Sequence, residues 1–244
     1  MRVSSTDIQN AFGKYLALAE KEDIIVVKNG KCVARLSRYT EPDFYIHEEA
    51  KSYPSLQKIT YEEYLALVES SDQRYELIDG DVYLLASPSF QHQVVVNEIA
   101  GSFYNFFKKT SCQSLTSPID IRLFGFAAKF EEDPNVVQPD IVVVCDQEKV
   151  RDSKYEGVPT LIVEVLSPST KGKDMAIKLQ LYLKSGVSEY WLVDMEEKNV
   201  IQYAFTKDRD IDSVTACAEE DTIQSRVFAD LQLPVSAIFA GITK

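Results

Sequence analysis

Three common patterns are missing from this sequence of 244 residues. Its four cysteines form no C-x-x-C pair, so neither the spacing of a zinc site nor a disulfide framework is present. No stretch approaches the ~18 consecutive apolar residues of a membrane span, and the first residues lack the apolar core of a signal peptide. We therefore expect a cytoplasmic protein without membrane contacts, whose thiols stay reduced. The cysteines are Cys32, Cys112, Cys145 and Cys217.

Positive charge is in the minority and is unevenly distributed. The formal net charge of the chain is −12. Residues 1–40 hold seven Lys and Arg against four Asp and Glu, a net charge of +3, so the remaining residues carry −15. The basic N-terminal part predicts contact with a polyanion. The acidic remainder argues against strong non-specific DNA binding in the absence of metal.

Apolar residues make up 45% of the chain, which suffices for a real core. Strand-like apolar runs and helical periodicities follow one another without an internal repeat. They predict an α/β fold in which helices flank a mixed sheet. Thr60 and Ser89 are expected helix N-caps, and Asp79-Gly80 is an expected hairpin turn. The expected strands are 74–78, 82–85, 119–124, 140–145, 160–166, 189–194 and 200–205, and the expected helices begin at 61, at 90 (to 108) and at 170 or 171 (to 185).

Residues 1–45 predict a small α+β unit of their own. A helix begins after Ser4, and the runs 24–27 and 32–36 form a hairpin around Asn29-Gly30. Such a unit of ~40 residues buries too little surface to be stable alone, so we expect it to dimerise. Residues 46–58 read as a linker, and 59–244 as the second domain.

Two carboxylates interrupt apolar runs in the second domain. Asp140 opens the run Ile141 to Val144, and Glu164 lies inside the run Leu161 to Leu166. A buried, unpaired carboxylate costs several kcal/mol. A divalent metal held by oxygen ligands would offset this cost, and a buried salt bridge to an arginine is the alternative.

The same segment resembles the PD-(D/E)XK nuclease superfamily. Pro139-Asp140 is followed after 23 residues by Glu164-Val165-Leu166, and the match extends through Asp174, Lys178, Tyr182 and the string from Glu189 to Asp194. The longer string is similar to the "putative restriction endonuclease" family over about residues 59–233. The resemblance implies that Asp140, Glu164 and the backbone carbonyl of Val165 bind Mg²⁺ or Mn²⁺, and that the protein hydrolyses phosphodiester bonds in DNA.

The lysine of the superfamily motif is displaced. Leu166 stands where the E-x-K pattern has lysine, and Lys178 on the following helix matches the family's pattern instead. There it would orient or activate the attacking water. The alternative is an ordinary surface pair with Asp174, four residues earlier. Lys171 and Lys173 are further candidates for the same role.

Three more residues are candidates for the site. Glu76 lies in the hairpin that matches the family's opening motif, and it either takes part in the metal site as a third acid or faces solvent. His92 and Asp120 are candidates for supporting the metal ligands, and a capping or hydrogen-bonding role is the alternative for His92. Trp191 and Tyr182 are expected in the core.

The N-terminal unit resembles the first half of the Phd/YefM antitoxin family. The similarity rests on Phe12 to Leu16, Ile25 to Asn29-Gly30-Lys31 and Val33 to Leu36. The resemblance implies a homodimer that binds DNA and a possible toxin-like partner, although the half that wraps a toxin is replaced by the second domain. The implied DNA contacts are Arg2, Ser4, Lys14 and Arg35, which are otherwise solvated surface residues.

Three functions are compatible with these features. The first is a metal-dependent DNA endonuclease that the N-terminal unit targets or regulates. The second is a DNA-binding regulator or antitoxin with a catalytically silent nuclease fold, which the broken E-x-K and the acidic second domain favour. The third is action on RNA, which lacks support because aromatic and basic residues are not interleaved.

Overall fold

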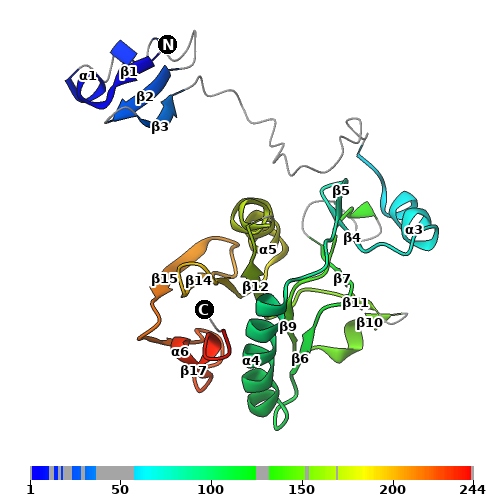
Figure 1. Cartoon of the computed structure of the whole chain (residues 1–244). Helices are drawn as coiled ribbons and strands as arrows, with labels where there is room; N and C mark the ends of the chain where they lie inside the picture. The colour runs from blue at the N-terminus through cyan, green and yellow to red at the C-terminus, as the bar shows by residue number, and fades with distance from the viewer. Residues whose placement is uncertain are drawn as a thin grey trace. The chain divides into compact units, whose positions relative to one another are not determined.

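The structure is a computed structural model of the chain. It describes residues 2–10, 14–15, 18, 24–28, 31–36, 58–124, 132–151, 154–168 and 170–242. The chain divides into two compact units, residues 1–47 and 48–244 (Figure 1). None of the helices within the described ranges combines the length and the apolar character of a membrane span.

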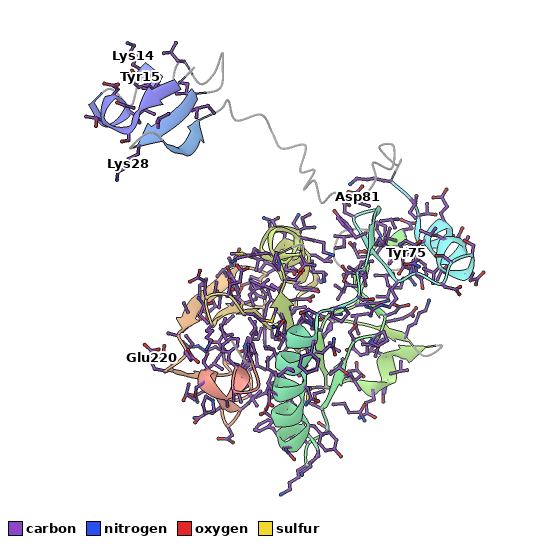
Figure 2. All side chains as sticks on the ribbon, in the orientation of Figure 1. Lys14, Tyr15, Lys28, Tyr75, Asp81 and Glu220 are labelled. Carbon is purple, nitrogen blue, oxygen red and sulfur yellow. A yellow bond between two sulfur atoms is a disulfide. The ribbon has the colours of Figure 1, made fainter. Side chains whose placement is uncertain are left out.

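The N-terminal unit is a three-stranded sheet with a helix. Strand β1 (Arg2–Ser4) pairs in parallel with β2 (Ile24–Lys28), which pairs antiparallel with β3 (Lys31–Leu36). Helix α1 (Ser5–Asn10) follows β1 directly. Val3 and Ile24 are buried and pack with apolar side chains of the helical segment. Figure 2 shows Lys14 and Lys28, both exposed, on this unit. The predicted hairpin strands are present, and the turn at Asn29-Gly30 lies outside the described residues.

The larger unit contains two six-stranded sheets, ordered β10-β11-β7-β8-β4-β5 and β15-β14-β13-β12-β9-β6. The strands are β4 (Tyr75–Ile78), β5 (Asp81–Leu84), β6 (Gln113–Thr116), β7 (Ile121–Arg122), β8 (Val136–Val137), β9 (Ile141–Val144), β10 (Val150–Arg151), β11 (Lys154–Glu156), β12 (Leu161–Leu166), β13 (Glu189–Asp194), β14 (Asn199–Phe205) and β15 (Ile211–Cys217). A separate pair is formed by β16 (Thr222–Gln224) and β17 (Gln232–Pro234). The helices are α3 (Tyr61–Glu69), α4 (Phe90–Phe107), the π-helix Lys173–Lys178, α5 (Leu179–Ser185) and α6 (Val235–Ile238), and a 3-10 turn covers Gln147–Lys149.

The second of these sheets is mixed, as predicted. β12 runs parallel to β13 and antiparallel to β9. Successive side chains of a strand point to opposite faces, so each buried strand contributes to two cores. Ile141, Val163 and Trp191 pack against α4, whereas Val142, Ile162 and Leu192 pack with Leu181 of α5. Figure 1 shows α4 alongside β6 and β9.

Local sequence signals place the helices that frame this sheet. Thr60 accepts a hydrogen bond from the Glu63 N–H, and the Glu63 carboxylate accepts one from the Thr60 N–H, which together form a capping box at α3. Ser89 accepts from the His92 N–H at the start of α4. Both N-caps were expected from the sequence, and both are confirmed.

Two predictions are corrected by the structure. Cys112 and Cys145 form a disulfide, so the expectation that all cysteines are unpaired thiols is wrong. The pairing of Gln113 with Val144 between β6 and β9 brings the two cysteines opposite each other, which spacing along the sequence does not reveal. The predicted strand 119–124 is reduced to Ile121–Arg122.

Candidate active site

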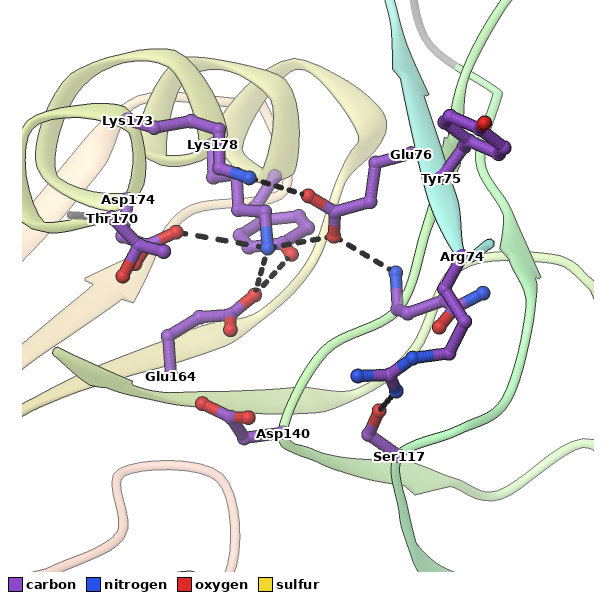
Figure 3. Close-up of polar contacts among 12 residues, drawn as sticks. Arg74, Tyr75, Glu76, Ser117, Asp140, Glu164, Thr170, Lys173, Asp174 and Lys178 are labelled. Atoms are coloured by element: carbon purple, nitrogen blue, oxygen red, sulfur yellow. Dashed lines mark hydrogen bonds and ion pairs between the residues drawn. The ribbon is translucent and has the colours of Figure 1, made fainter. Parts of the chain in front are cut away.

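Asp140 and Glu164 meet because their strands are neighbours in the sheet. Val163 of β12 pairs with Ile141 of β9, so the next pair along this antiparallel register is Glu164 with Asp140. Both lie two positions from a residue of the α5-facing core, Val142 on β9 and Ile162 on β12, so both are on the α5-facing side of the sheet. The Val165 N–H donates a 2.8 Å hydrogen bond to Asp140 Oδ2, which fixes that carboxylate. Figure 3 shows the two carboxylates next to each other.

Glu164 is held by two donors from the helical segment that follows it. Lys178 Nζ and Tyr182 Oη each donate to Glu164 Oε1 at 2.8 Å. All three side chains are buried. The second oxygen, Oε2, receives no hydrogen bond from any residue that the structure describes, so it is available to a ligand on the side of Asp140.

Glu76 is the third acid of the cluster, and it is fully buried on β4. Its Oε2 accepts from Lys173 Nζ at 2.8 Å, and its Oε1 lies 2.8 Å from Lys178 Nζ. The Gln138 N–H also donates to Oε1 at 3.0 Å. Glu76 therefore does not face solvent, and the hairpin brings it to the same lysine that holds Glu164.

A π-helix explains how two lysines reach one carboxylate. Residues Lys173–Lys178 form a π-helix whose i→i+5 bonds place residues five apart on the same face. In an α-helix, with 3.6 residues per turn, these two positions would diverge. Asp174 also lies in this segment, with Oδ1 3.6 Å from Lys178 Nζ. Because Asp174 and Lys178 are both buried, the alternative of an exposed surface pair is wrong.

His92 reaches the site from the first turn of α4. Its Nε2 lies 3.2 Å from Asp140 Oδ2 and 3.1 Å from the carbonyl oxygen of Val165. Burial alone would lower the pKa of His92, but its hydrogen bond to Asp140 and the charge of that residue outweigh burial and raise the pKa. The alternative of a salt bridge to an arginine is wrong for the described residues, where the cationic neighbours are His92 for Asp140 and Lys178 for Glu164.

The acids of the cluster have different pKa values because their neighbours differ. Burial raises the pKa of Glu164 to about 8, since the acidic neighbours Asp174, Asp140 and Glu76 counteract Lys178. Burial also acts on Glu76, but there the charges of Lys178 and Lys173 prevail and lower the pKa to about 2.

Lys178 stays protonated at neutral pH. Burial alone would lower its pKa, but the charges of Glu164, Glu76 and Asp174 outweigh burial and raise the pKa well above the ordinary value. Lys178 is therefore a hydrogen-bond donor and a fixed positive charge, and it is not suited to removing a proton from water.

The cluster has a deficit of positive charge that a divalent cation would fill. Four carboxyl groups face two lysines, which leaves a net charge of −2 when all acids are ionised and His92 is neutral; the acids are Asp140, Glu164, Glu76 and Asp174. Oδ1 of Asp174 is buried without a hydrogen-bond partner in the described part of the chain. Carboxylate oxygens are the ligands that Mg²⁺ and Mn²⁺ prefer. The donor chemistry therefore fits such an ion.

Two features count against a preformed three-ligand site. Within the described ranges, no group of three or more His, Cys, Asp or Glu side chains is arranged to hold a metal ion. The Val165 carbonyl, the predicted third ligand, already lies against His92. Asp140 and Glu164 are thus brought together, and the third ligand would come from a carbonyl that His92 shares, or from water.

The remaining predicted residues lie outside the carboxylate cluster or outside the described part of the chain. Asp120 accepts a 2.9 Å hydrogen bond from the Gln138 amide and reaches Glu76 only through Gln138. Lys171 pairs with Asp194 at 2.7 Å and does not join the cluster, whereas Lys173 does. On the N-terminal unit, Ser4 and Lys14 are exposed, and the side chains of Arg2 and Arg35 lie outside the described part.

Two contributors to the site were missed in the sequence. Tyr182 was expected in the core; it is buried as expected, but its hydroxyl also binds Glu164. Gln138, which precedes Pro139-Asp140, links Glu76 with Asp120 through its backbone and its side chain. The place of Tyr182 in the family's string was the one available signal, and nothing marked Gln138.

The mixed sheet, with Asp140 just before β9 and Glu164 within β12, matches a nuclease-like fold. A crystal structure described as a putative nuclease from Anabaena variabilis has the same fold, with a TM-score of 0.61 and 19% identity, over 75% of this chain and 98% of that one. Residues 61–236 match the Uma2 family, described as "Putative restriction endonuclease", and the chain belongs to that family.

Two proteins of Synechocystis (strain PCC 6803) are also similar to this chain. The uncharacterized protein slr1290 is 28% identical over 165 residues, which cover 67% of this chain and 82% of the relative. The uncharacterized protein sll1609 is 28% identical over 162 residues, 62% of this chain and 83% of the relative. In both cases the matched region covers about two thirds of the present chain.

Proposed function

We propose that this protein is a divalent-metal-dependent endonuclease that hydrolyses phosphodiester bonds in DNA. The observation that carries the proposal is the pair Asp140 and Glu164, cross-strand neighbours whose carboxylates share one face beside the protonated Lys178. Membership of a family described as restriction endonucleases agrees with it.

Each residue of the cluster has a distinct task in this proposal. Asp140 and Glu164 would hold Mg²⁺ or Mn²⁺ through the oxygens that face each other, with the Val165 carbonyl beside them. When bound, the cation supplies positive charge against the phosphate and lowers the pKa of the attacking water. Lys178 donates hydrogen bonds to a phosphate oxygen or to the water, and Glu76 keeps Lys178 charged and in place.

The test is DNA cleavage by the purified full-length chain with Mg²⁺, Mn²⁺ or EDTA. Supercoiled plasmid and a long phage DNA are used together, so that many sequences are sampled. We expect nicking or linearisation that requires metal and that Asp140→Asn abolishes. Asp208→Asn is the matched control, because it removes the same charge from an exposed turn. Equal cleavage by Asp140→Asn and wild type would refute the assignment of the site.

The N-terminal unit is proposed to bring the nuclease to DNA as an antitoxin-like homodimer. The net charge of +3 over residues 1–40 and the exposed Ser4 and Lys14 support a phosphate-binding surface. Arg2 and Arg35 are the other proposed contacts, and a toxin-like protein is the other proposed partner. Lys14→Ala should weaken binding of duplex DNA and reduce its salt dependence, with metal-dependent cleavage of a short oligonucleotide retained.

The second candidate is a DNA-binding regulator with a silent nuclease fold. It is favoured by the lack of a three-side-chain metal site among the described residues, and by Lys178 lying between Glu76 and Glu164. It predicts salt-sensitive, metal-independent operator binding and no cleavage of either DNA under any metal. Mn²⁺ titration calorimetry separates the two, since a silent fold shows no binding that depends on Glu164.

A further inference from the structure

A groove of about 750 Å³ lies between α4, β6 and the residues around β7, and none of the four acids of the cluster lines it. We call this groove the side groove. Its polar lining residues come from α4, β6, β11 and the segments next to β7 and β8: Tyr104, Ser114, Thr116, Asp120, Gln138 and Lys154. The volume is typical of a small-ligand pocket, for which about 300–1,000 Å³ is usual.

The side groove connects to the candidate active site at Gln138. The backbone N–H of this residue donates to Glu76 Oε1 at 3.0 Å, inside the cluster. Its side-chain amide donates to Asp120 Oδ1 at 2.9 Å, in the groove. Gln138 Oε1 is buried and has no hydrogen-bond partner among the described residues, which leaves an acceptor at this junction.

A second connection runs through Ser117, between the groove residues Thr116 and Pro118. The Ser117 N–H donates to the carbonyl oxygen of Asp140 at 3.1 Å. Its Oγ accepts a 3.3 Å hydrogen bond from Arg74 Nη1 (Figure 3). Ser117 therefore joins the edge of the groove to the backbone of Asp140 and to the side chain of Arg74.

Arg74 is a cation without an acidic partner where these two surfaces meet. In the part of the chain that the structure describes, no carboxylate lies within ion-pair distance of its guanidinium, in contrast to Lys173 and Lys178. Guanidinium groups bind phosphate with two parallel hydrogen bonds. Arg74 is thus placed to bind a phosphate between the cluster and the groove.

The groove itself suits a nucleobase better than a second phosphate. The Tyr104 side chain is 65% exposed, and such a ring offers a face on which a base can stack. The Asp120 carboxylate repels phosphate, and it can accept a hydrogen bond from the exocyclic amino group of a base. Ser114 and Thr116 add hydroxyl groups, and Lys154 Nζ lies 3.9 Å from Asp120 Oδ2.

We propose that the side groove binds one unpaired nucleotide of the DNA strand that is cut. The base stacks on Tyr104, an amino group of the base donates to Asp120, and the adjoining phosphate binds Arg74. In a duplex the base edge is paired and both base faces are stacked, so the substrate is single-stranded, overhanging or frayed DNA. This inference rests on the proposed nuclease function in one respect: the phosphodiester next to the bound nucleotide is the one that is cut.

The test measures binding without cleavage, by fluorescence anisotropy of the full-length chain in EDTA. The probes are fluorescein-labelled single-stranded deoxyadenosine and thymidine hexamers, with a blunt hairpin duplex and a ribo-adenosine hexamer as competitors. We expect tighter binding of the deoxyadenosine hexamer than of the thymidine hexamer and weak competition by the duplex, whose bases are paired and stacked. Tyr104→Ala should weaken binding about ten-fold through lost stacking, and Tyr104→Phe should not.

Matched surface variants separate the groove from general electrostatics. Arg74→Ala is compared with Lys207→Ala, Asp120→Asn with Asp208→Asn, and Tyr104→Ala with Val214→Ala; the three controls are exposed residues away from the groove. We expect Asp120→Asn to erase the preference for deoxyadenosine, and Arg74→Ala to weaken binding more than Lys207→Ala does.

Failure of this inference is distinguishable from failure of the nuclease assignment. If Tyr104→Ala binds the hexamer as wild type does, or if the duplex competes equally, the groove is not a site for an unpaired nucleotide. A stronger hold on the ribo-adenosine hexamer would overturn the choice of DNA. If the expected binding pattern is found but metal-dependent cleavage is absent, the nuclease assignment is wrong and the nucleotide site in the groove still holds.

Discussion

Glu76 and Glu164, 88 positions apart in the chain, approach the same ammonium group. Lys178 Nζ lies 2.8 Å from Glu76 Oε1 and 2.8 Å from Glu164 Oε1, and all three side chains are buried. Glu76 lies on β4 in the first sheet, and Glu164 lies on β12 in the second. Lys178 belongs to the helical segment between β12 and β13. Lys178 thus connects the two sheets at the candidate active site.

Removing Lys178 should destabilise the chain more than removing an exposed lysine does. Lys178→Met leaves Glu76 and Glu164 buried without their shared cation, which typically costs about 3–5 kcal/mol. Lys207→Met is the control, since Lys207 is exposed in a turn and exposed charges contribute little to stability. Urea unfolding measures both. The double variant Lys178→Met/Glu164→Gln should recover part of the loss, and no recovery would contradict the shared-cation arrangement.

The stability of the metal-free chain should fall as pH rises from 4.5 to about 8. The pKa of Glu164 is raised from 4.5 to about 8, so the folded chain holds this proton more tightly than the unfolded chain, and stability is lost as the proton leaves. Glu76, whose pKa is lowered to about 2, acts in the opposite direction but only below its usual value of 4.5.

Thermal unfolding in EDTA tests this dependence. Tm should fall as pH rises in wild type, and it should fall less in Glu164→Gln. The difference in Tm is about 2–4 °C for each kcal/mol of unfolding free energy that Glu164 contributes. His92, with its raised pKa, acts in the same direction in both proteins, so the difference between them reports Glu164. Mn²⁺ at pH 8 should raise the Tm of wild type and not of the variant. Parallel pH curves would show that Glu164 titrates normally.

Two glycines should respond in opposite ways to alanine. Gly101 lies in α4, and a Cβ added there would meet no atom within 4 Å, so Gly101→Ala should stabilise the chain by up to about 1 kcal/mol through helix propensity. Gly186 ends α5 with φ of +90°, a conformation that L side chains rarely adopt, so Gly186→Ala should destabilise it by about 1 kcal/mol or more. Chemical denaturation of the pair checks both signs.

Glu189 should be a structural carboxylate that tolerates no amide. It is fully buried and accepts hydrogen bonds from Trp191 Nε1 at 2.6 Å and Ser225 Oγ at 2.6 Å, and from Gln202 and two backbone N–H groups. Glu189→Gln places an NH₂ group against these donors, which costs roughly 1–3 kcal/mol for each donor left unpaired. Urea unfolding should report this loss, with cleavage by the folded fraction unchanged. Wild-type stability in the variant would show that the donors find other partners.

The predicted part of the site depended on strand alternation. Asp140 and Glu164 interrupt apolar runs, and because side chains alternate along a strand, their positions suffice to place them with the α5-facing residues. The helix caps at Thr60 and Ser89 are equally local, since a cap involves only three or four consecutive residues. The short strands β8, β10 and β16 were not predicted, because two or three residues carry no periodicity.

Other features of the site depend on distant segments. Sequence alone left open whether Glu76 faced solvent, because only the pairing of β4 with β8 buries it next to Lys173. The π-helix that aligns Lys173 with Lys178 leaves no trace in composition. The Cys112–Cys145 disulfide likewise depends on the register between β6 and β9.

The sequence by itself indicated the long helices, the longer buried strands, the two carboxylates and the family to which the chain belongs, because these depend on local patterns of apolar and polar residues. The tertiary structure decided that Lys178 is shared between Glu76 and Glu164, that His92 lies against Asp140, and that Gln138 joins the side groove to the cluster. The contacts of Lys178 join residues that are 14 and 102 positions apart in the chain. Their free energy depends on burial and on neighbouring charges, which only the packed chain specifies.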